Sequence, residues 1–369
     1  MPAIDALFHK MKEVGGSDLL LLEGQPPKYR VHGHVELVPD QPVLNHERIV
    51  GYLQEIAPKH HWEKYVKAGD ADFAYAMGAT DRFRANYYKQ QHGYAAVFRI
   101  IPVKILTLEQ LGVPQKLYEF TKLRNGLMLV TGPTGSGKST TLAAMINEIN
   151  EKYARHILTI EEPIEFVHPH KMSIITQREV GEHTQSFASA LKAASREDCD
   201  VILVGEMRDL ETIGLAVSAA EMGVLVFGTL HTNSAAKTID RIVNVFPPGQ
   251  QPQIRTMLAG SLRGVVSQTL CRKSDGKGRV AAQEILVSNT AVAAAIREGK
   301  IAKLNSIMTS GGQDGMVTMD DALLKHHEAG SITARELYMK SIDKKRFEAG
   351  MQAEEAATGA SGAPAKAGH

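Results

Sequence analysis

Residues 126–140 read Gly-Leu-Met-Leu-Val-Thr-Gly-Pro-Thr-Gly-Ser-Gly-Lys-Ser-Thr, and this stretch decides the fold. Its apolar first part predicts a buried strand, and a helical pattern follows the glycine-rich turn. Gly132, Gly137, Lys138 and Ser139 fill the pattern G-x-x-x-x-G-K-[ST] of a phosphate-binding P-loop. A strand, a loop of this composition and a helix in this order predict that the chain binds a nucleoside triphosphate.

Each residue type in this loop has a physical reason to be there. Glycines let backbone N–H groups curl around an anion, and the start of a helix adds a positive dipole end. Lys138 adds a charge near the β- and γ-phosphates, and the hydroxyl of Ser139 suits Mg²⁺. The expected nucleotide-binding residues are Gly132, Pro133, Thr134, Gly135, Ser136, Gly137, Lys138, Ser139 and Thr140.

Composition excludes several other classes of protein. The chain is 43% hydrophobic and 22% charged, and its net charge of +1 gives no reason to expect a nucleic-acid partner. No apolar run approaches the ~20 residues of a transmembrane segment, and no signal peptide is recognisable. Cys199 and Cys271 form no C-x-x-C pair, which favours the reducing cytoplasm and opposes a zinc or disulfide scaffold. Paired histidines such as His168 and His170 lack a third ligand and are expected at the surface.

The pattern along the chain predicts an α/β protein with more than one domain. Short strands and two helices are expected in a small α+β domain at the N-terminus. From about residue 119, apolar strands alternate with helical patterns, which predicts a mostly parallel sheet with helices on both faces. The expected parts are a domain at 1–100, a proline-bearing linker at 101–118, the sheet domain at 119–290, a helical subdomain at 291–350 and a disordered tail at 351–369.

Acidic residues follow two of the predicted strands. Hydrolysis of a triphosphate needs one carboxylate to support Mg²⁺ and another to orient the attacking water. One group, Glu161, Glu162 and Glu165, begins at the last residue of the strand at 156–161, and Glu206 with its neighbour Arg208 follows the strand at 201–205. His231 follows a third strand and is a candidate γ-phosphate sensor. Open parallel sheets bind ligands at the carboxyl ends of their strands, so we expect these groups near the P-loop.

Four boxes of the sequence resemble those of the secretion ATPase superfamily. They are the Walker A box at 132–140, the Asp box at 160–166, the Walker B box at 202–209 and the His box at 228–232. Within that superfamily the chain resembles the retraction ATPases of type IV pili from about residue 1 to 346. The resemblance implies a PAS-like N-terminal domain, a RecA-like ATPase domain, ATP with Mg²⁺, and a cytoplasmic homo-hexamer. It also implies a peripheral position at the inner membrane, on the platform protein of the pilus machine, and a role in twitching motility.

The resemblance also implies roles for single residues. Glu165 matches the glutamate that activates water, and Glu206 matches the Walker B acid that supports Mg²⁺ together with Ser139. Three arginines fall in N-terminal segments whose arginines reach the triphosphate in this family, namely Arg82, Arg84 and Arg99. A guanidinium suits that task because it offers forked donors and a permanent charge.

The chain departs from the family pattern at several positions. Glu162, Cys199 and Val224 stand where the family usually has aspartate, proline and histidine, and we expect all three near the nucleotide site. Residues 291–295 replace the usual Ala-Ile-Arg-Asn-Leu. These departures leave open a weakly hydrolysing, nucleotide-gated paralogue that serves as an accessory ring subunit. A pilus-assembly or type II secretion ATPase is the other alternative, and the missing four-cysteine zinc module opposes it.

Overall fold

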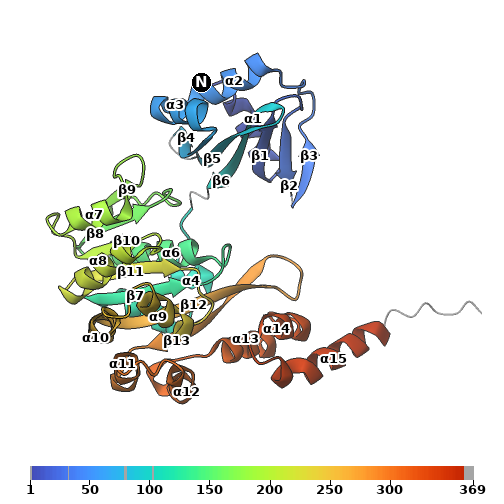
Figure 1. Cartoon of the computed structure of the whole chain (residues 1–369). Helices are drawn as coiled ribbons and strands as arrows, with labels where there is room; N and C mark the ends of the chain where they lie inside the picture. Colours follow the sequence, from blue (N-terminus) through green and yellow to red (C-terminus); the bar gives the residue numbers. More distant parts are fainter. Residues whose placement is uncertain (1, 32, 79–80, 102–103, 361–369) are drawn as a thin grey trace, which may run out of the picture. The chain divides into compact units, whose positions relative to one another are not determined.

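The computed structural model describes residues 2–31, 33–78, 81–101 and 104–360 (Figure 1). The chain divides into two compact units. The N-terminal unit is Met1–Ile105 together with Pro163–Val167, and the C-terminal unit is Leu106–Glu162 together with His168–His369. Each unit has its own hydrophobic core, so each is described by itself.

The N-terminal unit is an antiparallel sheet with helices packed on one face. The strands follow the order β3-β2-β1-β6-β5-β4. Its helices are α1 (Asp5–Glu13), α2 (His46–Ile56) and α3 (Lys59–Ala68), and its strands are β1 (Gly16–Leu22), β2 (Lys28–Val31), β3 (His34–Leu37), β4 (Asp70–Met77), β5 (Asp81–Gln90) and β6 (Gly93–Ile101). Strand β5 shows why one face is buried: Phe83, Ala85 and Tyr87 enter the core, while Arg84 between them is exposed.

The C-terminal unit is built on a mostly parallel sheet. Its strand order is β13-β12-β7-β11-β10-β8-β9, and among the described pairs of neighbouring strands only β12–β13 is antiparallel. The strands are β7 (Gly126–Thr131), β8 (His156–Glu161), β9 (Ile174–Glu179), β10 (Val201–Val204), β11 (Leu225–Leu230), β12 (Leu262–Arg272) and β13 (Arg279–Val287). The four strands expected between residues 127 and 230 are confirmed, whereas the apolar pattern did not predict β9, β12 or β13.

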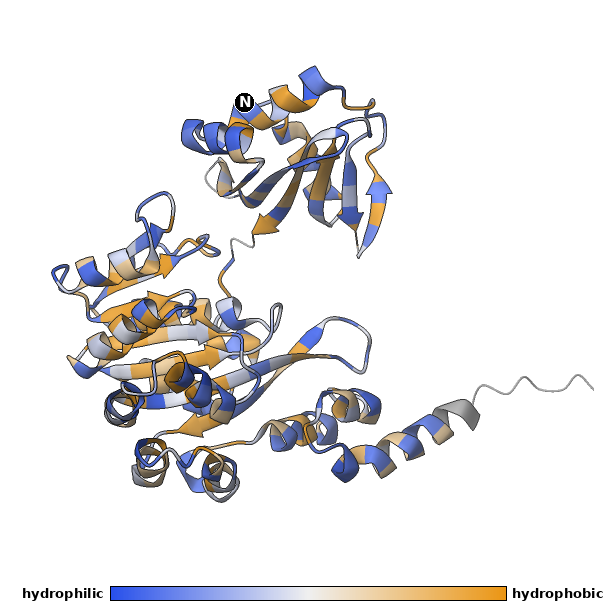
Figure 2. Cartoon of the chain, viewed as in Figure 1, coloured by the Kyte–Doolittle hydropathy of each residue, from blue (hydrophilic) through white to orange (hydrophobic). Residues whose placement is uncertain are grey.

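Helices cover both faces of this sheet because the strands bury side chains on both sides. Met128 and Val130 of β7 pack with the helices α4 (Leu108–Leu111), α5 (Gln115–Thr121) and α6 (Lys138–Lys152). Leu127 and Leu129 face the other layer, which contains α7 (Phe187–Ala194), α8 (Leu210–Glu221), α9 (Ala235–Asn244), α10 (Gln251–Ser261), α11 (Thr290–Arg297) and α12 (Lys303–Ser310). Figure 2 shows the resulting apolar strands between amphipathic helices. This architecture confirms the predicted fold class.

The last helices pack against the far end of the same sheet. After the short turn η1 (Gly312–Asp314) come α13 (Met319–Glu328), α14 (Ala334–Lys340) and α15 (Lys344–Ala360). Leu323 and Leu337 bury their side chains with Cys271 of β12 and Ala282 of β13. These helices therefore belong to the C-terminal unit, and the contacts do not separate a subdomain at 291–350.

Two of the predicted boundaries are wrong. The expected linker at 101–118 is largely helical from Leu108, and Leu108 and Leu117 are buried in the core of the C-terminal unit, which begins at Leu106. Pro102 lies outside the described residues. The expected disordered tail is helical as far as Ala360, because alanine and glutamate are strong helix formers and Glu354 accepts a hydrogen bond from the backbone of Arg335. Residues 361–369 lie outside the described residues.

No helix in the described part of the chain has the length and apolar character needed to cross a membrane.

Candidate nucleotide-binding site

The P-loop joins β7 to α6 in a conformation that needs glycine. Gly137 has φ 86° directly before the first residue of α6, a left-handed conformation that L side chains rarely adopt. A Cβ at Gly137 would also lie 2.8 Å from Nε2 of Gln268 on β12. Gly132 has φ 147°, and a Cβ there would collide with the carbonyl oxygen of Gln268. Because β12 lies so close, only backbone atoms of the loop fit beside it at these two positions.

Polar groups inside the loop converge on the space before α6. The ammonium of Lys138 donates hydrogen bonds to the carbonyl oxygens of Gly132 (2.8 Å) and Pro133 (3.2 Å). The hydroxyl of Ser136 is buried and has no hydrogen-bond partner among the described residues. A buried hydroxyl without a partner is costly, and an anion oxygen in the loop would satisfy it. The loop thus has the features of a phosphate cradle.

A buried amide network behind the loop is a part of the site that the sequence did not predict. Gln268 donates from Nε2 to the carbonyl oxygen of Ser136 at 2.6 Å. Its Oε1 accepts from the hydroxyl of Thr141 in α6 (2.9 Å) and from Nε2 of Gln283 in β13 (2.8 Å). One glutamine therefore connects the loop, the first turn of α6 and the β12–β13 hairpin. A lone glutamine in a strand has no sequence signature, so only the fold reveals this role.

Glu206, Arg208 and His231 form a charged cluster at the carboxyl ends of β10 and β11. Two nitrogens of the Arg208 guanidinium bind the carboxylate of Glu206. Nε lies 2.5 Å from Oε1, and Nη2 lies 2.6 Å from Oε2. His231 Nε2 lies 3.1 Å from Oε1. Partial burial raises the pKa of Glu206, but the hydrogen bond and charge of Arg208 outweigh it and, with His231, hold the pKa below its ordinary value. Glu206 is therefore a carboxylate at neutral pH.

The acids of the Asp box fall into both units. Glu161 ends β8 in the C-terminal unit and accepts hydrogen bonds from Thr159 (2.7 Å) and Gln177 (3.3 Å). Glu162 follows it and is exposed, and its charge acts on Arg208. Glu165 belongs to the segment Pro163–Val167, which is part of the N-terminal unit. The catalytic role expected for Glu165 stays a prediction.

The three expected arginines lie on the exposed face of the N-terminal sheet. Arg84 and Arg99 are directly opposite each other on β5 and β6, and Arg82 lies two residues from Arg84 on the same strand. Arg84 pairs with Asp72 at 2.6 Å, and Arg99 pairs with Asp18 at 2.8 Å. The fold brings the arginines together, and the two aspartates, which the sequence did not single out, hold two of them in place.

The departures from the family pattern lie in different places. Glu162 follows β8 at the edge that carries the P-loop, as expected. Cys199 and Val224 were also expected near the nucleotide site, and this prediction is wrong, because Cys199 precedes β10 and Val224 precedes β11. In a parallel sheet, those positions lie at the edge opposite the carboxyl ends, so neither residue lines the nucleotide site.

Comparison with known proteins places the chain in a family. The chain belongs to the Type II/IV secretion system protein family, whose model matches residues 23–359. A Twitching motility protein of Neisseria gonorrhoeae is 52% identical over 297 residues, 80% of this chain and 79% of that protein. The Type IV pilus retractation ATPase PilT of Pseudomonas aeruginosa is 49% identical over 322 residues, 87% of this chain and 93% of that protein.

Solved structures agree with these relatives. The crystal structure of the pilus retraction motor PilT with bound ADP superposes with a TM-score of 0.87 and 45% sequence identity, covering 95% of this chain and 99% of that one. The predicted resemblance to pilus-retraction ATPases, the two-domain fold class with a RecA-like core, and the assignment to a nucleotide-binding ATPase family are confirmed.

Proposed function

We propose that this chain is an ATP-hydrolysing motor that retracts type IV pili and so drives twitching motility. The observation that supports it most is the joint presence of an intact phosphate cradle and the anionic Glu206 at the same edge of one sheet. Relatives named for twitching motility and pilus retraction, about half identical to this chain, support the biological role.

The loop and the Walker B acid offer the oxygen ligands that Mg²⁺ prefers. The hydroxyl of Ser139, at the start of α6, and the carboxylate of Glu206 would hold the ion, directly or through water. The ion would neutralise charge on the β- and γ-phosphates. Lys138 and the backbone N–H groups bind the phosphates, and His231 reports on the γ-phosphate from the end of β11. Glu165 orients the attacking water.

The proposal includes a homo-hexamer. The P-loop alone leaves transition-state charge uncompensated, and arginine fingers add about 10³–10⁵ in rate. Arg82, Arg84 and Arg99 are the candidates, supplied when the N-terminal unit closes over the nucleotide of its own or a neighbouring subunit. Closure and opening would move the units as rigid bodies against the platform protein of the pilus machine at the inner membrane.

Phosphate release by the purified chain, with its particle size, tests this function. Wild-type protein should hydrolyse ATP as a ring, and Lys138→Ala should lose hydrolysis because the γ-phosphate loses its counter-charge. Glu165→Gln should keep ATP binding and slow hydrolysis by about 10²–10⁴, the contribution of a positioned base. Very slow hydrolysis by wild-type rings would instead indicate the accessory, nucleotide-gated subunit.

A further inference from the structure

A row of buried polar side chains crosses three neighbouring strands of the C-terminal unit. Thr131 ends β7 directly before the P-loop, Ser267 of β12 is its partner in register, and Glu284 of β13 is the partner of Ser267. Each of the three is at most 2% exposed. Residues paired in register on neighbouring strands project to the same face of a sheet. The phosphate chemistry proposed above uses none of these side chains.

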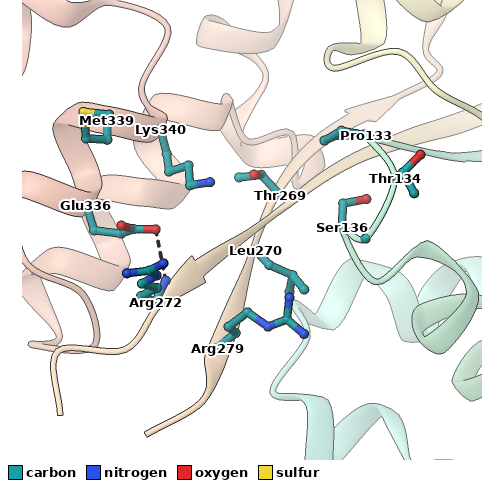
Figure 3. A pocket seen from close by; sticks show the side chains of 11 residues that line it. Pro133, Thr134, Ser136, Thr269, Leu270, Arg272, Arg279, Glu336, Met339 and Lys340 are labelled. Atoms are coloured by element: carbon teal, nitrogen blue, oxygen red, sulfur yellow. Dashed lines mark hydrogen bonds between the residues drawn. The ribbon is translucent and has the colours of Figure 1, made fainter. Parts of the chain in front are cut away.

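The middle strand of this row continues alongside the P-loop. Two residues beyond Ser267, Thr269 of β12 lines a hollow of about 450 Å³ together with loop residues 133–136 (Figure 3). Gln268, between them, binds the loop through its side chain. The row is therefore connected to the P-loop in two ways, through the chain at Thr131 and through β12.

Hydroxyl groups connect this row to the His box. Oγ1 of Thr131 lies 2.8 Å from Oγ of Ser267 and 3.4 Å from Oγ1 of Thr238, which is buried on α9. The hydroxyl of Thr238 also lies 2.7 Å from Oγ1 of Thr232, the residue that directly follows His231. Contacts between hydroxyls therefore join the end of β7 to the His box.

Glu284 holds the beginning of α9. Its Oε1 accepts a hydrogen bond from the backbone N–H of Ala235, the first residue of α9, at 2.7 Å. The backbone N–H of Met319, the first residue of α13, also donates to this carboxylate. The first N–H groups of a helix lack partners within the helix and carry partial positive charge, so a carboxylate suits both positions. One buried side chain thus binds the first residues of two helices.

The loop that carries His231 is short and is held at both ends. It comprises residues 231–234, between the last residue of β11 and the first residue of α9. The side chain of His231 is 47% exposed, and its Nε2 lies 3.1 Å from Oε1 of Glu206. The core does not enclose such a side chain, so its place depends on the loop, which Thr238 and Glu284 hold. A displacement of about 1 Å can lower a rate about 10²-fold.

Stability alone is a weak reason for these buried polar groups. The net gain from one buried hydrogen bond is small, and replacing both partners by apolar groups of the same shape can be nearly neutral. A hydrogen bond, unlike an apolar contact, fixes both the distance and the angle between two groups. The network therefore suits the placement of the loop better than the filling of a core.

We propose that Thr238 and Glu284 are positioning residues that set the place of His231 relative to the phosphate cradle. Thr238 ties the His box to the end of β7, where the P-loop begins, and Glu284 fixes the start of α9. Neither side chain touches the nucleotide, and both act through His231. The inference rests on the proposed function, because it requires ATP hydrolysis with His231 at the γ-phosphate.

Steady-state ATP hydrolysis by the full-length chain tests this assignment. Thr238→Val removes the hydroxyl at almost constant volume and should lower kcat about ten- to a hundredfold. KM for ATP and the affinity for ADP should stay within about twofold of the wild type, because the phosphate cradle is intact. Thr238→Ser keeps the hydroxyl and should retain most of the wild-type kcat. Glu284→Gln should also lower kcat, because the amide replaces one acceptor oxygen by a donor and removes the charge.

Thr256→Val is the matched control. Thr256 is exposed on α10, and its hydroxyl donates to the carbonyl oxygen of Pro252, four residues earlier, at 3.0 Å. The hydroxyl of Thr238 donates to the carbonyl oxygen of Ser234 in the same way at 2.7 Å. Both substitutions remove this bond within a helix, but only Thr238→Val removes contacts with β7 and the His box. The control should keep the wild-type kcat and KM.

A double-variant cycle separates positioning from general damage. If Thr238 acts through His231, adding Thr238→Val to His231→Ala should lower kcat no further, so the two losses should not multiply. Hydrogen exchange gives a readout that does not depend on activity. A non-hydrolysable ATP analogue should protect the backbone of residues 231–235 more than ADP does, and Thr238→Val should remove this difference. Should Thr238→Val fail to fold, Glu284→Gln in the same cycle decides.

Three results would overturn the assignment while the proposed function stands. They are an unchanged kcat in both Thr238→Val and Glu284→Gln, losses that multiply with that of His231→Ala, and a loss in Thr238→Val without one in His231→Ala. Wild-type protein that hydrolyses no ATP would overturn the proposed function and this inference with it.

Discussion

Glu206 lies beside Arg208 and His231, and its ionisation should limit hydrolysis at acidic pH. Burial alone would raise its pKa, and Arg208 is the main group that reverses this effect. In Arg208→Ala we therefore expect the pKa of Glu206 to rise and the acid limb of kcat/KM to move to higher pH. The measurement is ATP hydrolysis against pH. Arg241→Ala, an exposed arginine on α9, serves as the control, and an acid limb at the wild-type position would show that Arg208 does not set this pKa.

His168 should make the C-terminal unit sensitive to acid. It was expected at the surface, but it is buried, and burial, with the nearby charge of Lys171, lowers its pKa to about 4. In the unfolded chain the imidazole of His168 binds a proton near its ordinary pKa of about 6.5. The neutral, buried His168 therefore contributes fully to the stability of the fold above that pH, and this contribution is lost as the pH falls toward 4.

His168→Gln should remove this part of the pH dependence of the unfolding free energy. The effect of His168 amounts to about 3 kcal/mol between pH values above its unfolded pKa and below its folded pKa. Denaturant unfolding at neutral and at acidic pH measures it as a difference between wild type and variant. His9→Gln, at an exposed histidine, should keep the wild-type dependence. If His168→Gln lost stability in acid as steeply as the wild type, another group would be responsible.

Single residues were predictable from the sequence where a motif defines their chemistry. The P-loop glycines, Lys138 and Glu206 lie where the motif requires because backbone geometry and charge leave few alternatives. Gln268 carries no such signal. Its role depends on which strand lies beside β7, and its hydrogen bond to Ser136 joins residues 132 positions apart in the sequence.

At the scale of the elements, hydrogen bonds of Gln268 connect the β12–β13 hairpin to the P-loop. Gln268→Leu would leave the carbonyl of Ser136, the hydroxyl of Thr141 and the amide of Gln283 without this partner. Buried groups left unsatisfied cost about 1–3 kcal/mol each, so we expect a loss of at least about 2 kcal/mol in unfolding free energy and weaker ADP binding. Gln253→Leu, at an exposed position of α10, should change neither quantity. Unaltered stability of Gln268→Leu would mean that the network relaxes without it.

Strands were predictable from the sequence where their residues form an unbroken apolar run. β7, β10 and β11 are continuous apolar runs of the kind expected for a strand buried on both faces. β9 is Ile-Ile-Thr-Gln-Arg-Glu at the edge of the sheet, and because four of its six residues are polar its apolar pattern is weak. The helical end of the chain was missed for the opposite reason, because an alanine-rich composition was interpreted as low complexity although alanine favours helix.

At the scale of the whole molecule, the two units have separate cores, and the residues proposed for catalysis are divided between them. The P-loop, Glu206 and His231 belong to the C-terminal unit, whereas Glu165 and the arginines belong to the N-terminal unit. The sequence predicted two domains because composition and alternation change along the chain. It did not predict that Pro163–Val167 would be part of the other unit, because no local pattern indicates which core a short segment joins.

This division leads to the last prediction, which concerns assembly. Arg82→Ala and Arg84→Ala should each keep ATP binding, because the phosphate cradle is intact, yet lose most of the hydrolysis rate, because transition-state charge is uncompensated. Specific activity of the wild type should rise with protein concentration as rings form. A fragment starting at residue 106, which keeps Leu108 and Leu117 in its core, should bind ADP and hydrolyse almost no ATP. Lys67→Ala, on α3, is the control for the arginine variants. Full activity in dilute monomers, or in that fragment, would show that one C-terminal unit hydrolyses ATP alone and that the arginines have another role.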